Sequence, residues 1–351
     1  MKPNTISVFM ASDDNYAAIT DVAIISMLET TKSKIDLFLI NDGISDANCE
    51  KIKRTVAKYK NARLQILNVD IEKTFAGFKL WQHVSITTFA RLLIPWIKPT
   101  VKRAIWVDVD VLFLDDIALL YNQDLGKFAL GAAKCIEIER APDIKQDIFK
   151  LIDFGARHTY FNAGVLLIDC DAWRADKNLP NGFFEIERKY PDHLCADQDI
   201  LNKYFENNYK LLEQRFNITL PDATVFETAD EYNYTMLHPV IRHFCGQRKA
   251  HNWPHNPNAL NMIGLYEWWQ YAAKSEFFGE FVIKLIQIQD IETKRDTNEL
   301  QKHIDEIENN LRKAKRRKIW ISLFGIIPLL KIKSHTIYLF GFIPFFRIKR
   351  K

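Results

Sequence analysis

The sequence has 351 residues, of which 48% are hydrophobic and 26% are charged. A chain of this size and composition forms a substantial core, which excludes intrinsic disorder, a collagen-like repeat and a small disulfide-stapled domain. Five cysteines are scattered along the chain without a C-x-x-C pair, and no signal peptide precedes the first strand-like segment. These features favour a reduced, cytoplasmic compartment and argue against a zinc cluster.

The net charge of +4 is distributed unevenly along the chain. Residues 312–351 contain twelve Lys or Arg and no Asp or Glu, so the other 311 residues carry 36 basic and 44 acidic side chains, a net charge of −8. Nucleic-acid binding requires basic residues on the folded domain. The charge pattern therefore argues against nucleic acid as the main partner.

Hydrophobic patterns alternate between strands and helices over the first half of the chain. In chain order, strands are predicted at residues 6–11, 35–40, 63–69, 104–107, 127–133 and 163–168, and helices at 16–31, 45–60 (capped by Ser45) and 85–94. This alternation predicts an α/β fold with a mainly parallel sheet. Ligands of such sheets bind beyond the carboxyl ends of the strands, so the polar residues that follow strands are the first candidates for a site.

The C-terminal part differs in composition and predicts a division into three regions: a folded domain at 1–285, a charged helical linker at 286–318, and a basic, aromatic tail at 319–351. Leu300, Ile304, Ile307 and Leu311 follow a 4-3-4 spacing within the charged stretch 290–311. This spacing is typical of a long solvated amphipathic helix or of a short coiled coil, which would make a homo-oligomer.

The tail contains two copies of one motif, at residues 323–333 and 339–349, offset by sixteen residues. Spanning a bilayer takes about 20 apolar residues, and each apolar run is shorter and interrupted by Gly and Pro. Joining the copies would place Lys331 and Lys333 in the hydrocarbon layer. We expect residues 312–351 to bind an anionic membrane surface peripherally, with packing of the tail on the body or on a partner as the alternative.

Asp108 and Asp110 directly follow the strand predicted at 104–107. Side chains two apart on an extended segment share a face, so the two carboxylates lie together and repel unless a cation separates them. Oxygen ligands suit Mg²⁺ or Mn²⁺, which can hold a diphosphate and ease its departure. The alternative is a capped turn, because D-x-D also occurs by chance.

Three further segments have both a functional and a structural interpretation. In the segment 243–249, His243 could complete the metal site and favour Mn²⁺, while Gly246 and Lys249 could contact phosphate; a surface loop is the alternative. The acids Asp197 and Asp199 could serve a site or offset a helix dipole. Arg91 lies on an otherwise apolar helix face, where an exposed or ion-paired arginine is the default explanation. The segment 162–164 could be only a tight lead into a buried strand.

Taken in this order, the segments closely resemble the family 8 retaining glycosyltransferases, and within them the bacterial lipooligosaccharide α-1,4-galactosyltransferases. The matching segments are residues 11–18, 83–91, 108–110, 160–168, 197–202 and 243–249, and the resemblance covers residues 5–275. It implies the A-type glycosyltransferase fold, which binds nucleotide sugars. Ala250 and His251 depart from the Pro-Trp that often follows the lysine, and residues 136–159 and 218–236 match weakly, which leaves the acceptor least defined.

The resemblance also implies roles for individual residues. Asp13, Asn15 and Tyr16 would hold the uridine, and Lys249 with the backbone near Gly246 would hold the diphosphate. Arg91, Asp108, Asn162, Asp197 and Gln198 would contact the donor sugar, with Gly164 beside them. Asp108, Asp110 and His243 would ligate Mn²⁺, with Mg²⁺ as the alternative, and His83 and Cys245 would contact the acceptor.

Family 8 membership would imply a reaction that retains the anomeric configuration. Gln198 occupies the β-face position in this resemblance, which favours same-face substitution through an oxocarbenium-like ion pair over a covalent route through Asp197. The expected function is transfer of galactose or glucose from a UDP-sugar to a lipid-linked lipopolysaccharide core acceptor, at the inner face of the bacterial inner membrane. The rivals are transfer to a protein or polysaccharide primer, and a noncatalytic nucleotide-sugar or lipid-binding protein.

Overall fold

The structure of the protein is a computed structural model. It describes residues 5–79, 86–219, 226–246, 249–252 and 264–295, together with four short strands between residues 319 and 347. The chain divides into two compact units, Met1–Gly279 and Glu280–Lys351. In the described residues, the first unit contains a seven-stranded sheet and a two-stranded sheet, and the second contains a four-stranded sheet.

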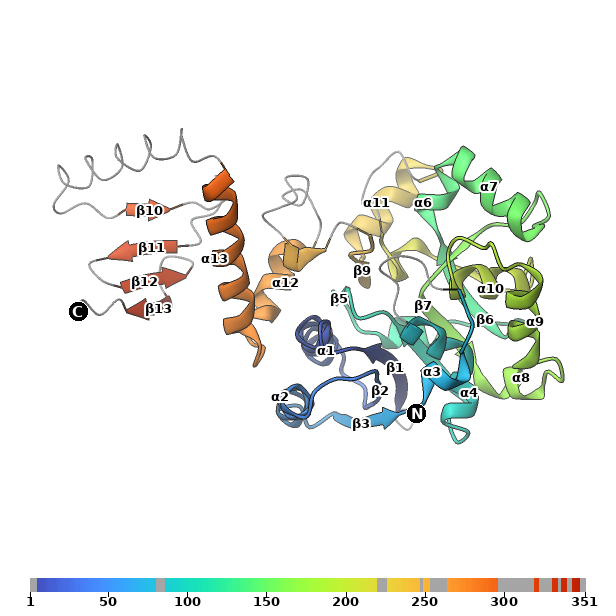
Figure 1. Ribbon diagram of the computed structural model, residues 1–351, viewed down its shortest axis with the longest axis horizontal. Coiled ribbons are helices and arrows are strands. Elements are labelled where there is room, and N and C mark those ends of the chain that lie inside the picture. Colours follow the sequence, from blue (N-terminus) through green and yellow to red (C-terminus); the bar gives the residue numbers. More distant parts are fainter. Residues whose placement is uncertain are drawn as a thin grey trace. The chain divides into compact units, whose positions relative to one another are not determined.

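Seven strands form the central sheet of the first unit in the order β3-β2-β1-β4-β7-β6-β8 (Figure 1). They are β1 (Ile6–Ser12), β2 (Ile35–Asn41), β3 (Ala62–Asn68), β4 (Arg103–Val107), β6 (Leu130–Lys134), β7 (Phe161–Asp169) and β8 (Lys210–Leu212). β1 runs parallel to β2 and β4, β2 to β3, and β6 to β8, whereas β7 runs antiparallel to both β4 and β6. The predicted α/β fold with a mainly parallel sheet is confirmed, and β7 is reversed within it.

The remaining elements connect these strands. The helical segments are α1 (Ala17–Thr30), α2 (Asp46–Ala57), α3 (Ile71–Thr74), η1 (Ile86–Leu93), α4 (Ile94–Ile97), α5 (Ala118–Tyr121), α6 (Ile136–Glu139), α7 (Pro142–Ile152), α8 (Cys170–Ala175), α9 (Asn181–Lys189), α10 (Asp197–Tyr204), η2 (Gln214–Phe216), α11 (Ala229–Leu237), η4 (Ala250–Asn252), α12 (Leu265–Ala272) and α13 (Phe278–Arg295). β5 (Val111–Phe113) and β9 (Ile241–His243) form a separate antiparallel pair.

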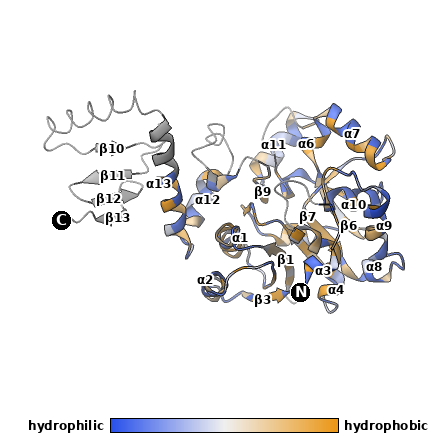
Figure 2. Ribbon diagram, in the orientation of Figure 1, coloured by the Kyte–Doolittle hydropathy of each residue, from blue (hydrophilic) through white to orange (hydrophobic). Residues whose placement is uncertain are grey.

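Burial explains why these residues form these elements. Every position of β7 from Phe161 to Ile168 is buried, the pattern expected of a strand covered on both faces. Helix α1 is apolar on nearly all sides and is buried along most of its length, so it belongs to the core. Helix α2 begins at the predicted cap Ser45, whose hydroxyl accepts a hydrogen bond from the Asn48 amide at 3.4 Å. Outer helices such as α7 mix hydrophobic and hydrophilic residues (Figure 2).

The helix predicted at residues 85–94 has a different form. Residues Ile86–Leu93 are wound as the 3₁₀ helix η1, and α4 follows with Pro95 in its first turn. Three residues make one turn of a 3₁₀ helix, so Thr88 lies directly before Arg91 on the same side. The Arg91 guanidinium donates to the Thr88 carbonyl at 3.0 Å and to its hydroxyl at 2.9 Å, and these contacts accompany the tighter winding.

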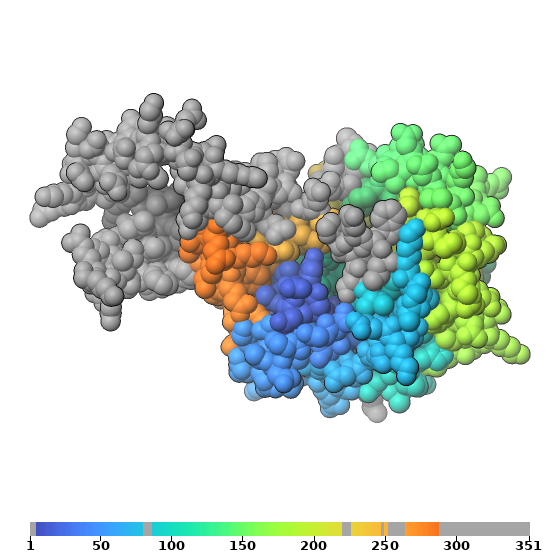
Figure 3. Space-filling view, in the orientation of Figure 1, coloured from blue at the N-terminus to red at the C-terminus, as the bar shows by residue number. Residues whose placement is uncertain are grey.

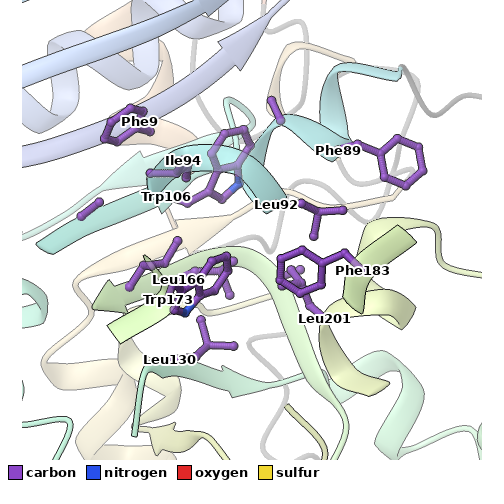
Figure 4. Close-up of a cluster of buried hydrophobic side chains, with 14 of the residues drawn as sticks. Phe9, Phe89, Leu92, Ile94, Trp106, Leu130, Leu166, Trp173, Phe183 and Leu201 are labelled. Carbon is purple, nitrogen blue, oxygen red and sulfur yellow. The ribbon is translucent and has the colours of Figure 1, made fainter. Parts of the chain in front are cut away.

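The main core lies against β4 and β7. Figure 4 shows Trp106 of β4 and Leu166 of β7 near Trp173 of α8 and Phe183 of α9. The rings of Trp173 and Phe183 have centroids 5.5 Å apart, and all four side chains are buried. Burying a large apolar side chain stabilises the fold by about 1.5–3 kcal/mol. This core therefore fixes the two strands whose ends carry the candidate site.

The second unit contains an antiparallel meander of β10 (Ile319–Ile321), β11 (Leu330–Lys333), β12 (Thr336–Leu339) and β13 (Ile343–Arg347). Its pairing follows the sequence repeat. Trp320 lies opposite Lys331 and Ile321 opposite Leu330; sixteen residues later, Thr336 lies opposite Arg347 and Ile337 opposite Phe346. The hairpins β10–β11 and β12–β13 therefore share the register of these two pairs, although β12–β13 also has a register shift between Ile337 and Tyr338. The sequence pattern predicts no strands here.

Some predictions fall on residues that the structure does not describe. Residues 296–318, which contain the apolar spacing from Leu300 to Leu311, are among them, so the coiled coil and the oligomer remain predictions. His83 also lies outside the described residues. Among the helices that are described, none is both long enough and apolar enough to cross a bilayer.

Candidate active site

The candidate site begins where β4 ends. Asp108 and Asp110 follow β4 and precede β5, and β5 pairs with β9 so that Val111 lies directly opposite His243. The Phe244 amide also donates to the Asp110 carbonyl at 2.8 Å. This two-stranded ladder brings a histidine from a distant part of the sequence to the acidic pair.

Three side chains at this position form a group suited to a metal ion. Asp108, Asp110 and His243 each offer one ligand atom, and these three atoms lie within 4.8 Å of one another. His243 Nε2 is 3.1 Å from Asp110 Oδ1 and 3.9 Å from Asp108 Oδ2, and the histidine is buried. Two carboxylate oxygens and one imidazole nitrogen match the donor preference of Mn²⁺, so the residues present fit the predicted ion.

Gly164 provides the space that this group needs. A Cβ at this position would lie 2.3 Å from His243 Cε1 and 2.8 Å from Asp108 Oδ2. The Gly164 carbonyl also accepts a hydrogen bond from the Asp108 amide at 2.8 Å. Gly164 was expected beside the donor sugar, and in the structure it supports two residues of the metal group through its backbone and its small size.

Lys249 also reaches the metal group, where its ammonium contacts the Asp110 carboxylate. Burial disfavours ionisation of Asp110, but His243 and Lys249 outweigh it and hold the pKa of this carboxyl well below its usual range. Burial likewise disfavours the charged form of Lys249, but Asp110 outweighs it and raises the pKa of the ammonium. Gly246 has φ +64°, a left-handed conformation that glycine adopts readily, in the turn between His243 and Lys249.

Arg91 links three elements around the site. Its guanidinium donates to Asp108 Oδ1 at 2.8 Å and to the Ala163 carbonyl at 2.5 Å, and its Nε is 2.9 Å from Asp197 Oδ2. The guanidinium also lies over the Trp106 ring, 4.7 Å from the ring centroid. Arg91 is therefore not exposed: it is a buried, ion-paired cation that connects Asp108, Asp197 and β7.

Asp197 and Gln198 begin α10 and face the same region. Burial raises the pKa of Asp197 to about 6, although Arg91 and the Thr88 hydroxyl, which donates to Asp197 at 2.6 Å, oppose this rise. Gln198 Oε1 accepts from the Ala163 amide at 2.9 Å, which ties this side chain to β7. Asp199 instead accepts from the Tyr160 hydroxyl and from two backbone amides, so it supports the loop before α10.

The residues expected at the uridine follow β1. Asp13 Oδ1 accepts from the Tyr16 amide at 2.9 Å, and the Asn15 side chain is 3.5 Å from Asp13 Oδ2. The Tyr16 ring meets the His251 ring edge-on, with centroids 6.4 Å apart. His251, one of the two departures from the family pattern, is thus a neighbour of the predicted stacking residue.

One cavity of about 440 Å³ joins these groups. Its lining includes Asp13 and Tyr16 together with Asp108, Asp110 and Lys249. Figure 3 shows the molecular surface hollowed beside the N-terminal segment drawn in dark blue. The candidate uridine and metal positions therefore share a single pocket.

Of the two residues expected at an acceptor, Cys245 lies among the described residues. Cys245 donates from Sγ to Glu137 Oε1 at 3.2 Å, and burial, followed by Glu137, raises the pKa of this thiol well above its usual value. Asn162 Oδ1 accepts from the Gly164 amide at 2.9 Å and from Asn217 Nδ2 at 2.8 Å. The structure thus brings Asn162 to the metal group, while His83 stays outside the described residues.

Sequence patterns missed four residues that touch this site: Thr88, Trp106, Glu137 and Asn217. Trp106 and Thr88 lie within motifs that were recognised, since the Trp106 ring nitrogen donates to Asp108 at 3.0 Å and Thr88 is in contact with Asp197. Their position within these motifs could have identified them as site residues. Glu137 and Asn217 lie in weakly matching or unremarkable segments, and nothing in the sequence singled them out.

The mainly parallel sheet and the group at its edge match a known class of enzymes. The crystal structure of the galactosyltransferase LgtC, in complex with donor and acceptor sugar analogues, matches with a TM-score of 0.65 and 28% identity, over 77% of this chain and 96% of LgtC. The fold is therefore that of the A-type glycosyltransferases. A family model, Glycosyl transferase family 8, matches residues 7–253, and the chain belongs to that family.

Curated relatives agree with this assignment. General stress protein A of Bacillus subtilis is 26% identical over 265 residues, which cover 72% of this chain and 89% of that protein. A lipopolysaccharide 1,2-glucosyltransferase of Escherichia coli is 24% identical over 281 residues, which cover 75% of this chain and 78% of the relative. The predicted resemblance to family 8 and to lipooligosaccharide galactosyltransferases is confirmed.

Proposed function

We propose that this glycosyltransferase moves galactose or glucose from a UDP-sugar to the core oligosaccharide of a lipopolysaccharide or lipooligosaccharide, with retention of the anomeric configuration. The observation that carries this proposal is the single cavity that connects Asp13 and Tyr16 to Asp108, Asp110 and Lys249. The same lining offers an aromatic ring that can stack on a base, and carboxylates and an ammonium that suit a metal-bound diphosphate. The similarity to LgtC and to a lipopolysaccharide glucosyltransferase supports the classes of donor and acceptor.

In this proposal the chain holds the donor through three sets of contacts. Tyr16 stacks on the uracil while Asp13 and Asn15 hydrogen-bond the nucleoside. Lys249 and the backbone at Gly246 bind the diphosphate, which takes over from Asp110 as the partner of the ammonium. Arg91, Asn162 and Asp197 hold the hydroxyls of the sugar. The ion pair of Arg91 with Asp197 and the hydrogen bonds of Asn162 with Gly164 and Asn217 keep these side chains oriented before the donor arrives.

Asp108, Asp110 and His243 would hold Mn²⁺, or alternatively Mg²⁺, at the diphosphate. A divalent ion in this position supplies charge stabilisation to the departing UDP. The chain's own contribution is to keep two half-buried carboxylates and the imidazole of a buried histidine close together. The nearby Lys249 would add a second positive charge toward the same leaving group.

The arrangement of Asp197 favours same-face substitution over a covalent route. Its carboxylate is engaged on one oxygen by Arg91, at 2.9 Å, and on the other by Thr88, at 2.6 Å. Attack on the sugar would require this group to give up an ion pair in a buried site, which is costly. We therefore propose that the sugar–diphosphate bond breaks to an oxocarbenium-like ion pair, and that the leaving diphosphate takes the acceptor's proton. Gln198 lies beside the sugar as a polar neighbour.

The donor class is tested by slow hydrolysis of a panel of UDP-sugars with Mn²⁺, which needs no acceptor. We expect release of UDP from UDP-galactose or UDP-glucose, and loss of this release in Asp110→Asn. The matched control is Asp115→Asn, which removes an exposed carboxylate on the far side of β5 and should keep the activity. Failure to hydrolyse any UDP-sugar, or hydrolysis that Asp110→Asn leaves unchanged, would contradict the proposal.

The route of substitution is tested separately. Gln198→Ala should retain appreciable transfer activity, because the proposed route makes no covalent use of this side chain. Mass spectrometry of the wild-type enzyme, quenched during turnover with a slow donor, should find no attached hexose. A glycosyl adduct on Asp197 would replace same-face substitution with the covalent route.

We also propose that residues 312–351 attach the enzyme to the inner face of the bacterial inner membrane, where a lipid-linked acceptor is accessible. Alternate residues along a strand and directly paired residues occupy the same face of a sheet. The pairing of β11 with β12 and of β12 with β13 therefore assigns Lys331, Lys333 and Arg347 to positions on one face. Each basic residue near an anionic surface contributes about 1 kcal/mol at most, and this segment has twelve.

Deletion of residues 312–351 tests this attachment. We expect binding to vesicles containing anionic lipid to fall sharply, while transfer to a short soluble acceptor continues. Vesicles of neutral lipid serve as the control, and the full-length enzyme should bind them only weakly. Loss of both activity and vesicle binding on deletion would instead mean that the tail is part of the catalytic fold.

A further inference from the structure

Asn217 lies between two parts of the site and has no role assigned so far. It follows η2, and its exposed fraction is 0%. Its Nδ2 donates to Asn162 Oδ1 at 2.8 Å, and its Oδ1 lies 3.0 Å from Nδ1 of His243. One buried amide thus connects a residue at the proposed donor sugar with a residue of the candidate metal group.

The direction of these hydrogen bonds follows from a backbone amide. The Gly164 N–H donates to Asn162 Oδ1 at 2.9 Å, and a backbone N–H can only donate, so this Asn162 atom is the amide oxygen. The Asn217 group that faces the same oxygen must then be its NH₂. The remaining Asn217 atom is therefore its oxygen, and an amide oxygen can only accept. His243 Nδ1 consequently carries a proton.

This assignment fixes the state of the other imidazole nitrogen. His243 Nε2 points toward the carboxylates, 3.1 Å from Asp110 Oδ1 and 3.9 Å from Asp108 Oδ2. Because Nδ1 is the donor to Asn217, Nε2 is the ring nitrogen that faces the acids, and it is the one that would offer a lone pair to a divalent cation bound there. Histidines that bind metal usually donate their other ring N–H to a fixed acceptor in this way.

We propose that Asn217 is a positioning residue that sets the tautomer and ring orientation of His243 for a divalent cation and, through Asn162, couples the metal site to the donor sugar. This inference rests on the metal site of the proposed function. Two hydrogen bonds to the backbone of Asn217 hold this residue independently of its side chain. The side-chain NH₂ of Gln214 donates to the Asn217 carbonyl at 2.8 Å, and the backbone N–H of Asn217 donates to the Gln214 carbonyl at 3.0 Å. The side-chain amide can therefore be replaced while the backbone stays anchored.

Two substitutions in the full-length protein separate the contact of Asn217 with His243 from its contact with Asn162. Asn217→Ala removes both hydrogen bonds and is expected to weaken Mn²⁺ binding about 10–100-fold. Asn217→Asp keeps an acceptor for His243 Nδ1 but places an oxygen against Asn162 Oδ1. We expect this variant to bind Mn²⁺ nearly as well as the wild type but to show a KM for the UDP-sugar raised about tenfold, the effect of one lost hydrogen bond.

Mn²⁺ binding is measured without donor, from the electron paramagnetic resonance signal of the free ion, and melting temperatures verify folding. Asn61→Ala is the matched control, because it removes a side-chain amide that makes two hydrogen bonds far from the site in sequence, to Thr31 and Ser33. Wild-type Mn²⁺ affinity in Asn217→Ala would overturn the proposal. An Asn217→Asp variant as weak as Asn217→Ala would overturn it too, because hydrogen-bond acceptance would then not be what orients the ring.

A measurement on the wild type covers the case in which these variants do not fold. Nitrogen NMR of ¹⁵N-histidine-labelled protein with diamagnetic Mg²⁺ should show His243 protonated at Nδ1 and not at Nε2, with His243→Gln used to assign the signal. A proton on Nε2 and a bare Nδ1 would overturn the proposal. If the wild type itself binds no divalent ion, the metal site of the proposed function fails; if it binds the ion and the variants match it, only this inference fails.

Discussion

The candidate metal group and the C-terminal tail differ in how far apart in the sequence their contacting residues lie. Asp108 and Asp110 meet His243 only because β5 pairs with β9, so residues far apart in the sequence form one site. The tail instead builds two hairpins from contiguous residues, and their pairing repeats every sixteen residues. A convergent site is sensitive to each neighbour that holds it, whereas a repeated one can lose a copy and keep the other.

Removing the cation that organises the convergent site should have the largest effect. Arg91→Met leaves the buried Asp197 and the adjacent Asp108 without their shared guanidinium. We expect the free energy of unfolding to fall by about 3–5 kcal/mol, together with loss of donor hydrolysis. Chemical denaturation measures the loss. Lys53→Met, which breaks an exposed ion pair with Glu50, should leave stability close to that of the wild type, and equal effects of the two substitutions would contradict the assigned role of Arg91.

A substitution that fills the space at Gly164 should disturb the same site by displacing side chains, without removing a charge. The new methyl group of Gly164→Ala would displace the His243 ring and the Asp108 carboxylate. Displacements of about 1 Å cost on the order of 100-fold in rate, and we expect UDP-sugar hydrolysis to fall by about this factor. Gly279→Ala is the control, because a Cβ there would meet no atom within 4 Å. Activity near the wild-type level in Gly164→Ala would show that the group tolerates rearrangement.

A smaller effect is expected at a buried acid outside the site. Asp21 accepts hydrogen bonds from Ser275 at 2.6 Å and from Thr55 at 3.1 Å, yet burial raises its pKa to about 6. Between about pH 4 and 6 the folded state binds this proton more readily than the unfolded chain, so stability falls as the pH rises through that range. The rise corresponds to roughly 3 kcal/mol as an upper bound.

Asp21→Asn should remove this dependence. We expect a higher melting temperature than the wild type at pH 8 and little difference, or a lower one, at pH 4, because only the wild type must bury a charge at high pH. Thermal unfolding across this range measures it. Asp192→Asn, whose carboxylate is 79% exposed, should follow the wild type. A variant curve parallel to the wild-type curve would contradict the raised pKa.

The smallest effect on catalysis is expected in the tail. Deletion of residues 334–351 removes one copy of the motif and leaves the other, so vesicle binding should lie between that of the full chain and that of the chain lacking residues 312–351. UDP-sugar hydrolysis should remain close to the wild type, because none of the described residues that line the candidate pocket belongs to the tail. Vesicle binding as low as after the full deletion would show that the two hairpins do not act as separable units.

The sequence predicted the central sheet well because its strands are short, apolar and separated by clear helical patterns. It also predicted the acidic pair and His243, since a resemblance to known enzymes joined segments that spacing alone could not. The reversed direction of β7 could not be predicted, because hydrophobic periodicity carries no information about strand direction. Likewise, the burial of Arg91 could not be predicted, because its partners Ala163 and Asp108 are distant in sequence.

Asn217 and Glu137 were missed for a related reason. A buried amide or carboxylate in an unremarkable segment acquires meaning only from what it touches, and the partners of Asn217 are Asn162 and His243. The tail strands were missed because Gly and Pro interrupt each apolar run, a pattern that favours a membrane-surface segment over a strand.

The register of the tail has one further consequence. The contact between the two hairpins, β11 against β12, is an antiparallel pairing of the same kind as the pairing inside each hairpin. A meander of this kind grows by adding a hairpin to its last strand, so a third unit would not require a new type of pairing. Under the proposed role of the tail, duplication or loss of one hairpin would change the strength of membrane attachment in steps, while the described residues that line the candidate pocket stay the same.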